Sequence, residues 1–393
     1  MATVLPLLPA ILEHREEDVA MRHHLHAHPE LGLEEFQTSD FVAEKLAGFG
    51  CQVHRGLGVT GVVASLERGA GGRSVGLRAD MDALPIHEAT GLPYASRHPG
   101  RMHACGHDGH TAALLAAARY LAREGRFSGT VNFIFQPAEE GLGGARRMIE
   151  DGLFERFPCD AVFGLHNFPG YPLGLFGARP GLFMASSDTV RITVHGRGGH
   201  GSAPHLCVDA AVVAAHIVVA LQTVVARNVD PRQMAVVSVG SLHAGDVANV
   251  IAETADLQVT VRAYVPEVRA ALRERITSLV QGQAKALGAE VTIDYQWRYP
   301  ALYNDPGMTE FAGGVVRERF GEDALVRDLQ PLTGSEDFAF MLEARPGCMV
   351  IVGGGDEPGR CGLHNPGYDF NDAVLPVAAS YWALLAEAFL GGR

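Results

Sequence analysis

Two secondary-structure patterns share this chain, and the order in which they appear limits the folds open to it. Up to about residue 186 and again from residue 300, short apolar strands alternate with helices. We predict strands at 62–66, 74–77, 129–135, 161–165 and 349–353, and helices at 14–28, 39–49, 111–124, 308–320 and 374–390. Strands that alternate with helices predict an α/β fold with a largely parallel central sheet.

The middle of the chain, residues 187–299, follows a different pattern. Its predicted elements are a strand at 189–195, a helix at 208–225, strands at 235–242 and 254–264, a helix at 267–287 and a strand at 291–297. This β-α-β-β-α-β order is typical of a ferredoxin-like unit, in which two helices cover one face of a four-stranded antiparallel sheet. We therefore predict a discontinuous domain, 1–186 and 300–393, that carries the middle block as an inserted domain.

Five residues with metal-binding side chains lie in four short segments of the discontinuous domain. The segments are HACGHDGH (103–110), QPAEE (136–140), LHN (165–167) and LHNPGYDFND (363–372), and their candidate ligands are Cys105, His107, Glu140, His166 and His364. One thiol, three imidazoles and one carboxylate are too many ligands for a closed tetrahedral site, and they suit a two-metal centre with room for water. If they converge, the protein is a metal-dependent hydrolase, and His364 completes a site that begins before residue 170.

Glu139 directly precedes the candidate ligand Glu140 and is the candidate general base. Adjacent side chains diverge, so we expect one carboxylate to bind metal while the other faces the substrate. A general base takes a proton from the attacking water and later passes it to the leaving amine. An isolated Glu-Glu pair is more often a solvated loop feature, but the buried strand before it and the other candidate ligands favour the functional interpretation.

Residues around these segments are candidates for supporting roles. Asp82, in RADMDALP (78–85), can accept the free N–H of a ligating histidine and fix its tautomer, or it caps a loop. Asp108 either complements the dipole of the helix that follows it or supports a ligand from behind. We expect His103 and His110 to be structural or supporting residues rather than ligands.

Bulk composition excludes some functions. The formal net charge of −13 argues against a nucleic-acid or anionic-membrane surface, so we expect neither kind of partner. The apolar start turns charged within its first 17 residues, which argues against a signal peptide, and no stretch reaches the uninterrupted apolar length of a membrane span. Six scattered cysteines indicate reduced thiols rather than a disulfide framework, so we predict a cytoplasmic protein.

Taken together, the motifs resemble one known family. They are RADMDALP, MHACGHDGHTA, FQPAEEG, GLHN, GHGSAPH, NVI (249–251), GSEDF (334–338) and LHNPGYDFND, and they extend from about residue 22 to residue 372. The chain resembles the metallo-aminoacylase/carboxypeptidase family of amidohydrolases, in the branch of hippurate hydrolases and auxin–amino-acid-conjugate hydrolases. GSEDF or NVI alone is a weak signal, whereas the full set is highly specific.

The resemblance implies a two-metal catalytic domain with an inserted lid or dimerisation domain. It assigns the metal-ligand roles to Cys105, His107, Glu140, His166 and His364, and the role of general base to Glu139. It implies that His200 stabilises the tetrahedral oxyanion, often in the active site of the partner subunit, although the Gly-rich segment around it taken alone favours a flexible surface loop. It also implies that Asn249 and Arg262 hold the carboxylate or carbonyl of the substrate.

Arginine suits a free carboxylate because its donors form a fork, but Arg262 can also be an ordinary salt-bridged strand residue. Two departures from the family pattern leave the substrate open. Val259-Thr260-Val261 precedes Arg262 where the family has a glycine–threonine lead-in, and HAGDVA (243–248) lacks the usual Gly-Gly opening.

We therefore predict hydrolysis of the amide bond of N-acyl amino acids, hippurate-like or N-acetylated, to a carboxylic acid and a free amino acid. The predicted cofactors are two divalent metal ions per subunit, zinc, manganese, nickel or cobalt. The alternatives are a metallocarboxypeptidase or dipeptidase, an N-carbamoyl-amino-acid hydrolase, or a non-catalytic amino-acid-binding protein on the same fold. The resemblance and the apolar helix at 208–225 favour a homodimer or homotetramer, although that helix can instead be buried within its own domain.

Overall fold

The computed structural model describes residues 6–391, in two compact units. The first unit comprises Met1–Gly181, Tyr303–Gln330 and Asp337–Arg393, and the second comprises Leu182–Leu302 and Pro331–Glu336. Residues 1–5, which open the apolar start discussed above, lie outside the described part of the chain.

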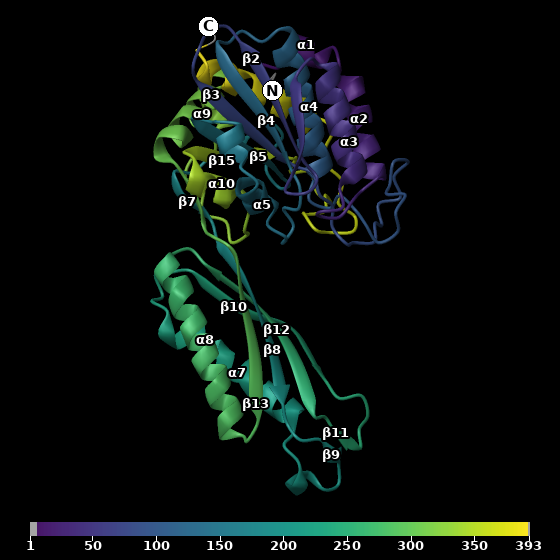
Figure 1. The fold of residues 1–393 in the computed structure, drawn as a ribbon, viewed down its shortest axis with the longest axis vertical. Coiled ribbons are helices and arrows are strands. Elements are labelled where there is room, and N and C mark those ends of the chain that lie inside the picture. Colours follow the sequence, from purple (N-terminus) through teal and green to yellow (C-terminus); the bar gives the residue numbers. More distant parts are fainter. Residues whose placement is uncertain (1–5, 392–393) are drawn as a thin grey trace. The chain divides into compact units, whose positions relative to one another are not determined.

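A seven-stranded mixed sheet forms the centre of the first unit (Figure 1). Its order is β1-β2-β4-β3-β5-β15-β6. The strands are β1 (Gln52–Leu57), β2 (Gly61–Arg68), β3 (Ser74–Asp80), β4 (Gly129–Gln136), β5 (Ala161–Phe168), β6 (Phe176–Gly177) and β15 (Gly347–Gly353). The four central strands β4, β3, β5 and β15 are parallel, and the outer pairs are antiparallel. The predicted α/β fold with a largely parallel central sheet is thereby confirmed.

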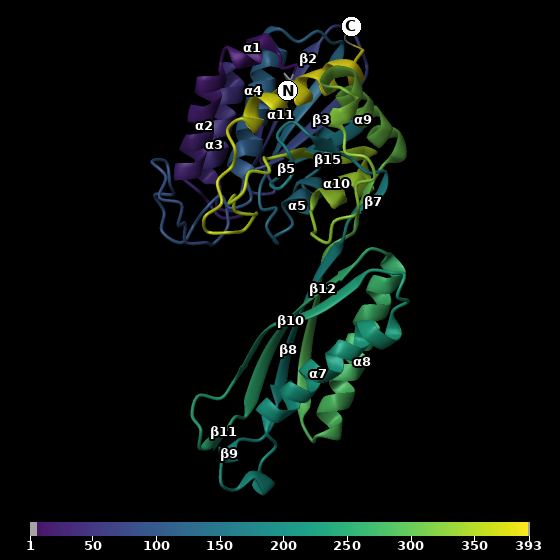
Figure 2. The same cartoon turned by 180° about the vertical axis from the view of Figure 1, so that it is seen from behind.

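Helices cover both faces of this sheet (Figures 1 and 2). They are α1 (Pro9–Leu12), α2 (Arg15–Ala27), α3 (Phe36–Gly48), α4 (His107–Arg123), α5 (Gly144–Glu150), α6 (Leu153–Arg156), α9 (Pro306–Phe320), α10 (Phe338–Ala344) and α11 (Val374–Phe389), with a 3-10 turn at Glu322–Ala324. α4 and α11 pack against each other and against the central strands, and α5 and α10 pack together on β4, β5 and β15.

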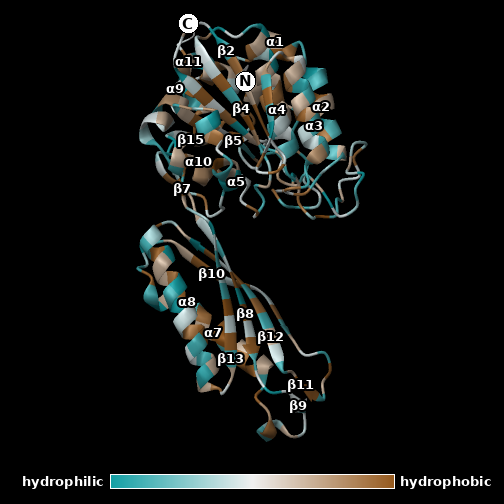
Figure 3. Ribbon diagram, viewed as in Figure 1, coloured by the Kyte–Doolittle hydropathy of each residue, from teal (hydrophilic) through white to brown (hydrophobic). Residues whose placement is uncertain are grey.

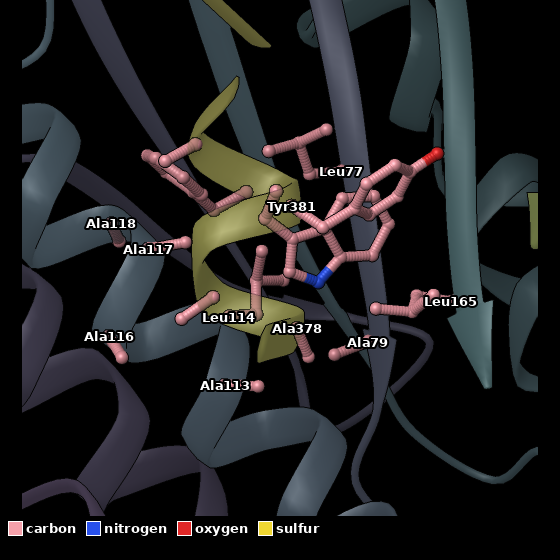
Figure 4. Close-up of a cluster of buried hydrophobic side chains, with 14 of the residues drawn as sticks. Leu77, Ala79, Ala113, Leu114, Ala116, Ala117, Ala118, Leu165, Ala378 and Tyr381 are labelled. Carbon is pink, nitrogen blue, oxygen red and sulfur yellow. The ribbon is translucent and has the colours of Figure 1, made fainter. Parts of the chain in front are cut away.

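The core of the first unit lies between α4, α11 and the sheet. α11 is apolar all round, and nearly all of it is buried, as expected for a helix enclosed on every side. Figure 4 shows Ala378 and Tyr381 of α11 close to Leu114 of α4 and Leu77 of β3. This core joins the N-terminal part of the unit to the C-terminal segment that follows the second unit in sequence.

Most predicted elements of the first unit are present, with shifted boundaries. α4 begins at His107 rather than residue 111 because Gly106, at φ 94°, forms its N-cap. A Cβ at Gly106 would lie 2.5 Å from the side-chain oxygen of Asn167, so only glycine fits there. β1, β6, α1, α5, α6 and α10 were not predicted; β6 has two residues, the four helices have four to seven residues each, and β1 is an edge strand with exposed residues and an irregular register near Arg55.

The second unit contains a four-stranded antiparallel sheet of order β10-β12-β8-β13. Its elements are β8 (Ser186–His195), α7 (Ala210–Asn228), β10 (Ala235–Ala244), β12 (Thr254–Ala263), α8 (Pro266–Ala286) and β13 (Glu290–Tyr299), so the ferredoxin-like prediction matches in element type and order. Two further strands, β9 (Gly199–His200) and β11 (Val250–Ile251), pair with each other. Short strands β7 (Gly181–Met184) and β14 (Leu302–Asn304) and a 3-10 turn at Pro204–Leu206 complete the list.

α7 corrects one expectation. By length and composition this helix passes the test for a membrane span, although no segment was expected to reach that length. Its buried residues Val213, Ile217, Leu221 and Val224 form one stripe that packs with α8 on the four-stranded sheet, so one face of the helix belongs to the core of its own unit, while Val212 and Val219 are exposed. Figure 3 shows brown positions in α7 and in the sheet beside it, and more teal along the exposed side of α8.

Candidate metal centre

The carboxyl ends of the parallel strands bring the candidate segments together. β3 ends at Asp80 and β4 ends at Gln136, within the motifs RADMDALP and FQPAEEG, and the motif GLHN lies at the end of β5, just before Phe168. Parallel strands share one carboxyl edge, and ligand sites in open α/β sheets form there. The first ligand helix, α4, begins at His107 at the same edge, where Thr111 donates a hydrogen bond to the carbonyl of Asp80.

The five predicted ligands lie in one continuous group of side chains. Sulfur, oxygen and nitrogen atoms of Cys105, Glu140 and His364 lie within 4.8 Å of one another, and the same is true of His107, Glu140 and Glu139. Cys105 Sγ lies 3.5 Å from His166 Nε2, which joins the fifth residue to the set. The convergence that the sequence left conditional is therefore present in the structure.

Hydrogen bonds fix the orientation of two of the imidazoles. His107 Nδ1 lies 2.9 Å from the carbonyl oxygen of Asp82 and 3.2 Å from its carboxylate, so Nδ1 donates to Asp82 and Nε2 is the ring nitrogen available to a metal. His166 Nδ1 lies 2.7 Å from the carbonyl oxygen of Asn167, which likewise directs Nε2 toward the group. Asp82 also accepts the backbone N–H of Glu140 at 2.9 Å, so it contacts two ligand residues.

The unpartnered atoms of this group are those that a metal ion needs. His107 Nε2 and Glu140 Oε1 are buried, and neither has a hydrogen-bond partner among residues 6–391. Glu140 Oε1 lies 3.2 Å from His364 Nε2, and the two form an ion pair when His364 is protonated. Buried polar atoms without partners cost free energy, so their grouping around one space fits cations held by thiolate, imidazole and carboxylate.

The pKa values of two of these residues, His364 and His166, also fit a site for cations. Interactions with the neighbouring side chains of Cys105 and Glu140 raise the pKa of His364 to about 10, so a proton occupies this position when no cation does. Burial lowers the pKa of His166 well below its usual value and keeps that ring neutral, as a ligand must be. His364 keeps a side chain that is 52% exposed, which leaves this part of the group open to solvent.

Glu139 and Glu140 do not diverge as predicted. β4 ends at Gln136, and both glutamates lie in a turn, so the side-chain alternation of a strand no longer applies and both carboxylates reach the vicinity of His107. The two residues still have different hydrogen bonds. The side chain of Glu139 accepts the backbone N–H of Asp337 at 3.4 Å, and the backbone of Glu140 donates its N–H to the carboxylate of Asp82.

A buried carboxylate that the sequence gave no reason to select supports this turn. Ala138 has a φ of 56°, which is unfavourable for a residue with a side chain, and its N–H donates to Glu35 at 2.8 Å. Glu35 also accepts the hydroxyl of Thr60 at 2.6 Å. Burial raises the pKa of Glu35 to about 7. No local pattern marks this role, because the contact spans 103 positions.

Asp80 and His110 lie closer to the ligands than the sequence indicated. Oxygen and nitrogen atoms of Asp80, His110, His107 and His166 fall within 4.8 Å of one another. His110 Nδ1 lies 2.6 Å from Asp80, and its Nε2 lies 2.6 Å from the side-chain oxygen of Asn167, so both ring nitrogens are already bound. This agrees with a supporting role for His110 behind the ligand histidines.

Asp108 occupies the first turn of α4, where its charge complements the helix dipole. It also binds two basic side chains, those of Arg22 and His26. Its carboxylate lies 2.8 Å from Arg22 Nε and 2.8 Å from His26 Nδ1. Burial alone would raise the pKa of Asp108, but the charge of Arg22 and the hydrogen bond from His26 hold it well below its usual value.

The remaining predicted residues lie at the two ends of the second unit. His200 on β9 pairs with Val250 on β11, and Asn249 accepts the backbone N–H of Gly201, so His200 and Asn249 are neighbours. Both side chains are exposed. Arg262 lies near the other end of β12, eight positions beyond Thr254, and is therefore about 26 Å along the strand from the end that adjoins β9 and β11.

The structure does not support the alternative that Arg262 is a salt-bridged strand residue. Its guanidinium donates only to the hydroxyl of Thr260 and the carbonyl of Val261, and within residues 6–391 it forms no ion pair with a carboxylate. Burial lowers its pKa, which is the expected effect on a partly enclosed cation.

Comparison with known proteins identifies relatives along nearly the whole chain. A sequence profile of the peptidase family M20/M25/M40 matches residues 76–388. Hippurate hydrolase of Campylobacter jejuni is 46% identical over 384 residues, which are 98% of this chain and 99% of that protein. N-acetyl-L-cysteine deacetylase of Bacillus subtilis is 40% identical over 367 residues, 93% and 86% of the two chains.

A solved structure agrees. The YxeP protein of Bacillus subtilis, described as a dinuclear metal-binding peptidase of the M20 family, is similar with a TM-score of 0.80 at 34% identity, covering 97% of this chain and 100% of that one. The family resemblance predicted from the motifs is confirmed.

Proposed function

The chain belongs to the peptidase family M20/M25/M40, and from this premise we propose that it is a metal-dependent amidohydrolase that cleaves N-acyl amino acids. The products are a carboxylic acid and a free amino acid. One observation carries this proposal: five ligand side chains and an additional carboxylate, Glu139, meet in a single group at the carboxyl edge of the sheet. The names of the relatives, a hippurate hydrolase and an N-acetyl-L-cysteine deacetylase, agree with this class of substrate.

The cofactor that fits this group is a pair of divalent ions held by Cys105, His107, Glu140, His166 and His364. When bound, such ions acidify water and polarise the acyl carbonyl. Thiolate and imidazole ligands suit zinc, cobalt or nickel, and the carboxylate and open positions also accept manganese. A supporting contact comes from Asp82, on the ring of His107, whereas Asp108, the residue after His107, binds Arg22 and His26.

Glu139 is the general base of the proposed reaction. It is 7% exposed and accepts one backbone N–H, so its carboxylate is held in place beside the ligands. It removes a proton from the attacking water and delivers that proton to the leaving nitrogen, which must be protonated before it departs as an amine.

The second unit supplies the substrate contacts in this proposal. His200 donates to the oxyanion of the tetrahedral intermediate, and Asn249 lies beside it. Arg262, which has no carboxylate partner of its own among the described residues, binds the free carboxylate of the substrate. Val259-Thr260-Val261 and the segment 243–248 then tune which amino acid is accepted.

A homodimer, or a homotetramer built from dimers, follows from the separation of these residues. His200 and Arg262 lie at opposite ends of the second unit, farther apart than one small substrate can reach. They can act on the same molecule only if they come from different copies, so we propose that the second unit is the dimerisation domain and lid. We place the enzyme in the cytoplasm, a proposal that the six free cysteines support.

Mixing two inactive variants tests action across subunits. In co-expressed Glu139→Gln and His200→Ala chains, half of the dimers are mixed, and each mixed dimer regains one intact site if His200 acts on its partner. Activity then returns to about a quarter of the wild-type value by this symmetry argument. No recovery, in a preparation shown to contain mixed dimers, would place His200 in its own subunit's site or outside catalysis.

A substrate panel tests the activity itself. Protein reconstituted separately with zinc, manganese, cobalt and nickel is assayed on hippurate, N-acetyl amino acids, N-carbamoyl amino acids and dipeptides. We expect the highest kcat/KM on hippurate or an N-acetyl amino acid. A preference for dipeptides would indicate a carboxypeptidase or dipeptidase, and a preference for carbamoyl compounds would indicate an N-carbamoyl-amino-acid hydrolase. Hydrolysis of none, with fewer than about one ion bound per chain, would favour a binding protein on the same fold.

A further inference from the structure

Arg22 is a fully buried cation surrounded by carboxylates, and no catalytic role accounts for it. It lies on α2, with none of its side chain exposed. Its guanidinium donates to Asp108 at 2.8 Å, to Asp372 at 3.1 Å and to Asp369. Placing this group in the protein interior costs several kcal/mol unless its donors are paired, so the three contacts compensate for a substantial penalty.

The three carboxylates come from two segments that carry metal ligands. Asp108 follows the candidate ligand His107 in the first turn of α4. Asp369 and Asp372 belong to the segment 363–372, which contains the candidate ligand His364. One guanidinium therefore joins the ligand helix to the ligand loop, across a separation of more than 250 residues in sequence.

Aromatic rings close the space around this cation. The guanidinium carbon lies 5.0 Å from the ring centre of Tyr94 and 5.8 Å from that of Phe370, both within the range of cation–π attraction. Tyr94 also donates to Asp369 at 3.0 Å and stacks on His23, whose ring lies 2.8 Å from Asp372. Tyr94 and His23 therefore also fix the positions of Asp369 and Asp372, in addition to Arg22.

The His364 loop needs such a hold. His364 has a φ of 63°, an unfavourable conformation for a residue with a side chain, and its ring is half exposed. Its backbone is bound at one end, where its N–H donates to the carbonyl of Ala104 at 2.7 Å. A strained and exposed ligand persists only if the surrounding structure fixes the loop, and Arg22 fixes the far end.

The same pair of helices offers a matched comparison. Arg119 on α4 is also buried, and it pairs with Asp18 on α2 at 2.8 Å. This ion pair joins α2 to α4 just as Arg22 does, but among the described residues Arg119 forms its hydrogen bonds and ion pairs with Asp18 and Glu17 and none with residues 363–372. Figures 1 and 2 both show α2 beside α4. Both arginines join these two helices, but only Arg22 also binds Asp369 and Asp372 of the segment 363–372.

We infer that Arg22 is a positioning residue of the metal centre, which clamps the His364 loop onto the His107 helix through Asp108, Asp369 and Asp372. The inference rests on the proposed metal site, because its consequence is a change in metal affinity. Lysine keeps the charge at this position but lacks the planar fork that holds three carboxylates at once. Arg22→Lys should therefore loosen the loop without leaving the carboxylates uncompensated.

The test compares cobalt binding by the full-length wild-type protein, Arg22→Lys and Arg119→Lys. Metal-free protein is titrated with Co²⁺ in competition with a chelator, and the thiolate-to-cobalt absorption reports contact with Cys105. Loss of a partner that orients ligands typically costs about 10- to 100-fold in metal affinity, which is the weakening expected for Arg22→Lys. Arg119→Lys should lower the unfolding temperature to a similar degree and keep the wild-type affinity.

The possible outcomes separate the clamp from the metal site itself. Wild-type protein that binds no cobalt at all contradicts the proposed function, and with it the clamp. Wild-type protein that binds cobalt, with equal affinities in the two lysine variants, overturns the clamp alone. If Arg22→Lys fails to fold, Asp372→Asn replaces it. Asp372 is a partly exposed residue of the loop, and its substitution leaves the ion pairs of Arg22 with Asp108 and Asp369 in place. We expect it to weaken cobalt binding several-fold, and unchanged affinity would refute the inference.

Discussion

The candidate residues of the two units differ in how firmly the protein holds them. In the first unit, His107 is completely buried with its ring bound by Asp82, and Glu139 is 7% exposed with its carboxylate bound to a backbone N–H. In the second unit, His200 is exposed, and its ring accepts hydrogen bonds from Ser202, two residues away. The contacts that orient the candidate residues of the first unit therefore form when that unit folds, before any ligand binds.

The difference predicts two kinds of mutant. Changes in the first unit alter a network of buried contacts, so they affect stability or metal retention as well as activity. Changes at the exposed residues of the second unit should affect activity alone, because nothing in that unit depends on them for its fold. The predictions below test this contrast, beginning with the largest expected effect.

Glu139→Gln should abolish most turnover while metal stays bound. Removing a general base typically costs about 10²- to 10⁴-fold in kcat, and glutamine cannot accept the proton. The five ligands remain, so metal content measured by elemental analysis should equal that of the wild type. A variant with nearly normal kcat would exclude Glu139 as the base, and a variant without metal would make it a ligand.

His200→Ala should lower kcat by about 10²- to 10³-fold, the usual effect of losing one oxyanion donor. Because the ring is exposed and its hydrogen bonds within the described part of the chain are with Ser202, the free energy of unfolding should stay within about 0.5 kcal/mol of the wild type. Steady-state kinetics and urea unfolding of the same preparation check both. A clearly destabilised variant would show that His200 has a structural role and would break the contrast between the units.

Glu35→Gln should change the pH dependence of stability. The pKa of Glu35 is raised to about 7 in the folded protein from 4.5, so its contribution is fully present below pH 4.5 and is lost as the pH rises toward 7. In metal-free protein, the unfolding free energy of the wild type relative to Glu35→Gln should fall by about 3 kcal/mol between pH 4.5 and pH 8. A difference that does not vary with pH would mean that this carboxyl titrates normally.

Arg262→Ala should raise KM about 10- to 100-fold for an N-acyl amino acid, the value of a charged hydrogen bond, with a smaller change in kcat. The matched control is the same N-acyl amino acid with its carboxylate converted to an amide, on which wild type and variant should differ little. Equal losses on both substrates would remove Arg262 from carboxylate binding.

The secondary structure and the ligand set were largely predictable. β10, β12, α8 and α11 appear within a few residues of their predicted bounds, because the first three have a regular apolar pattern and α11 is a long, continuously apolar segment. β1 and α5 were missed because the first is an exposed edge strand and the second has only seven residues. Cys105 and His107 could be selected because metal-binding residues cluster around them within eight positions.

The contacts that hold the ligands could not be predicted in the same way. Glu35 contacts Ala138 across 103 positions, and Arg22 contacts Asp372 across 350. Neither residue stands out locally, since an acidic or basic residue on or beside a helix is usually solvated. The expected divergence of Glu139 and Glu140 failed for a related reason: adjacent side chains were expected to point apart, but the turn at this point brings both carboxylates near His107.

The sequence alone determined the kinds of elements, their order and the chemical types of the ligands, because these depend on periodicity and on side-chain chemistry that is local to each segment. Tertiary structure decided that Glu139 and Glu140 converge, that Arg22 joins two ligand segments, and that His200 and Arg262 lie at opposite ends of one unit. Those results depend on distances between residues far apart in the chain. Only packing of the core brings such residues together or keeps them apart.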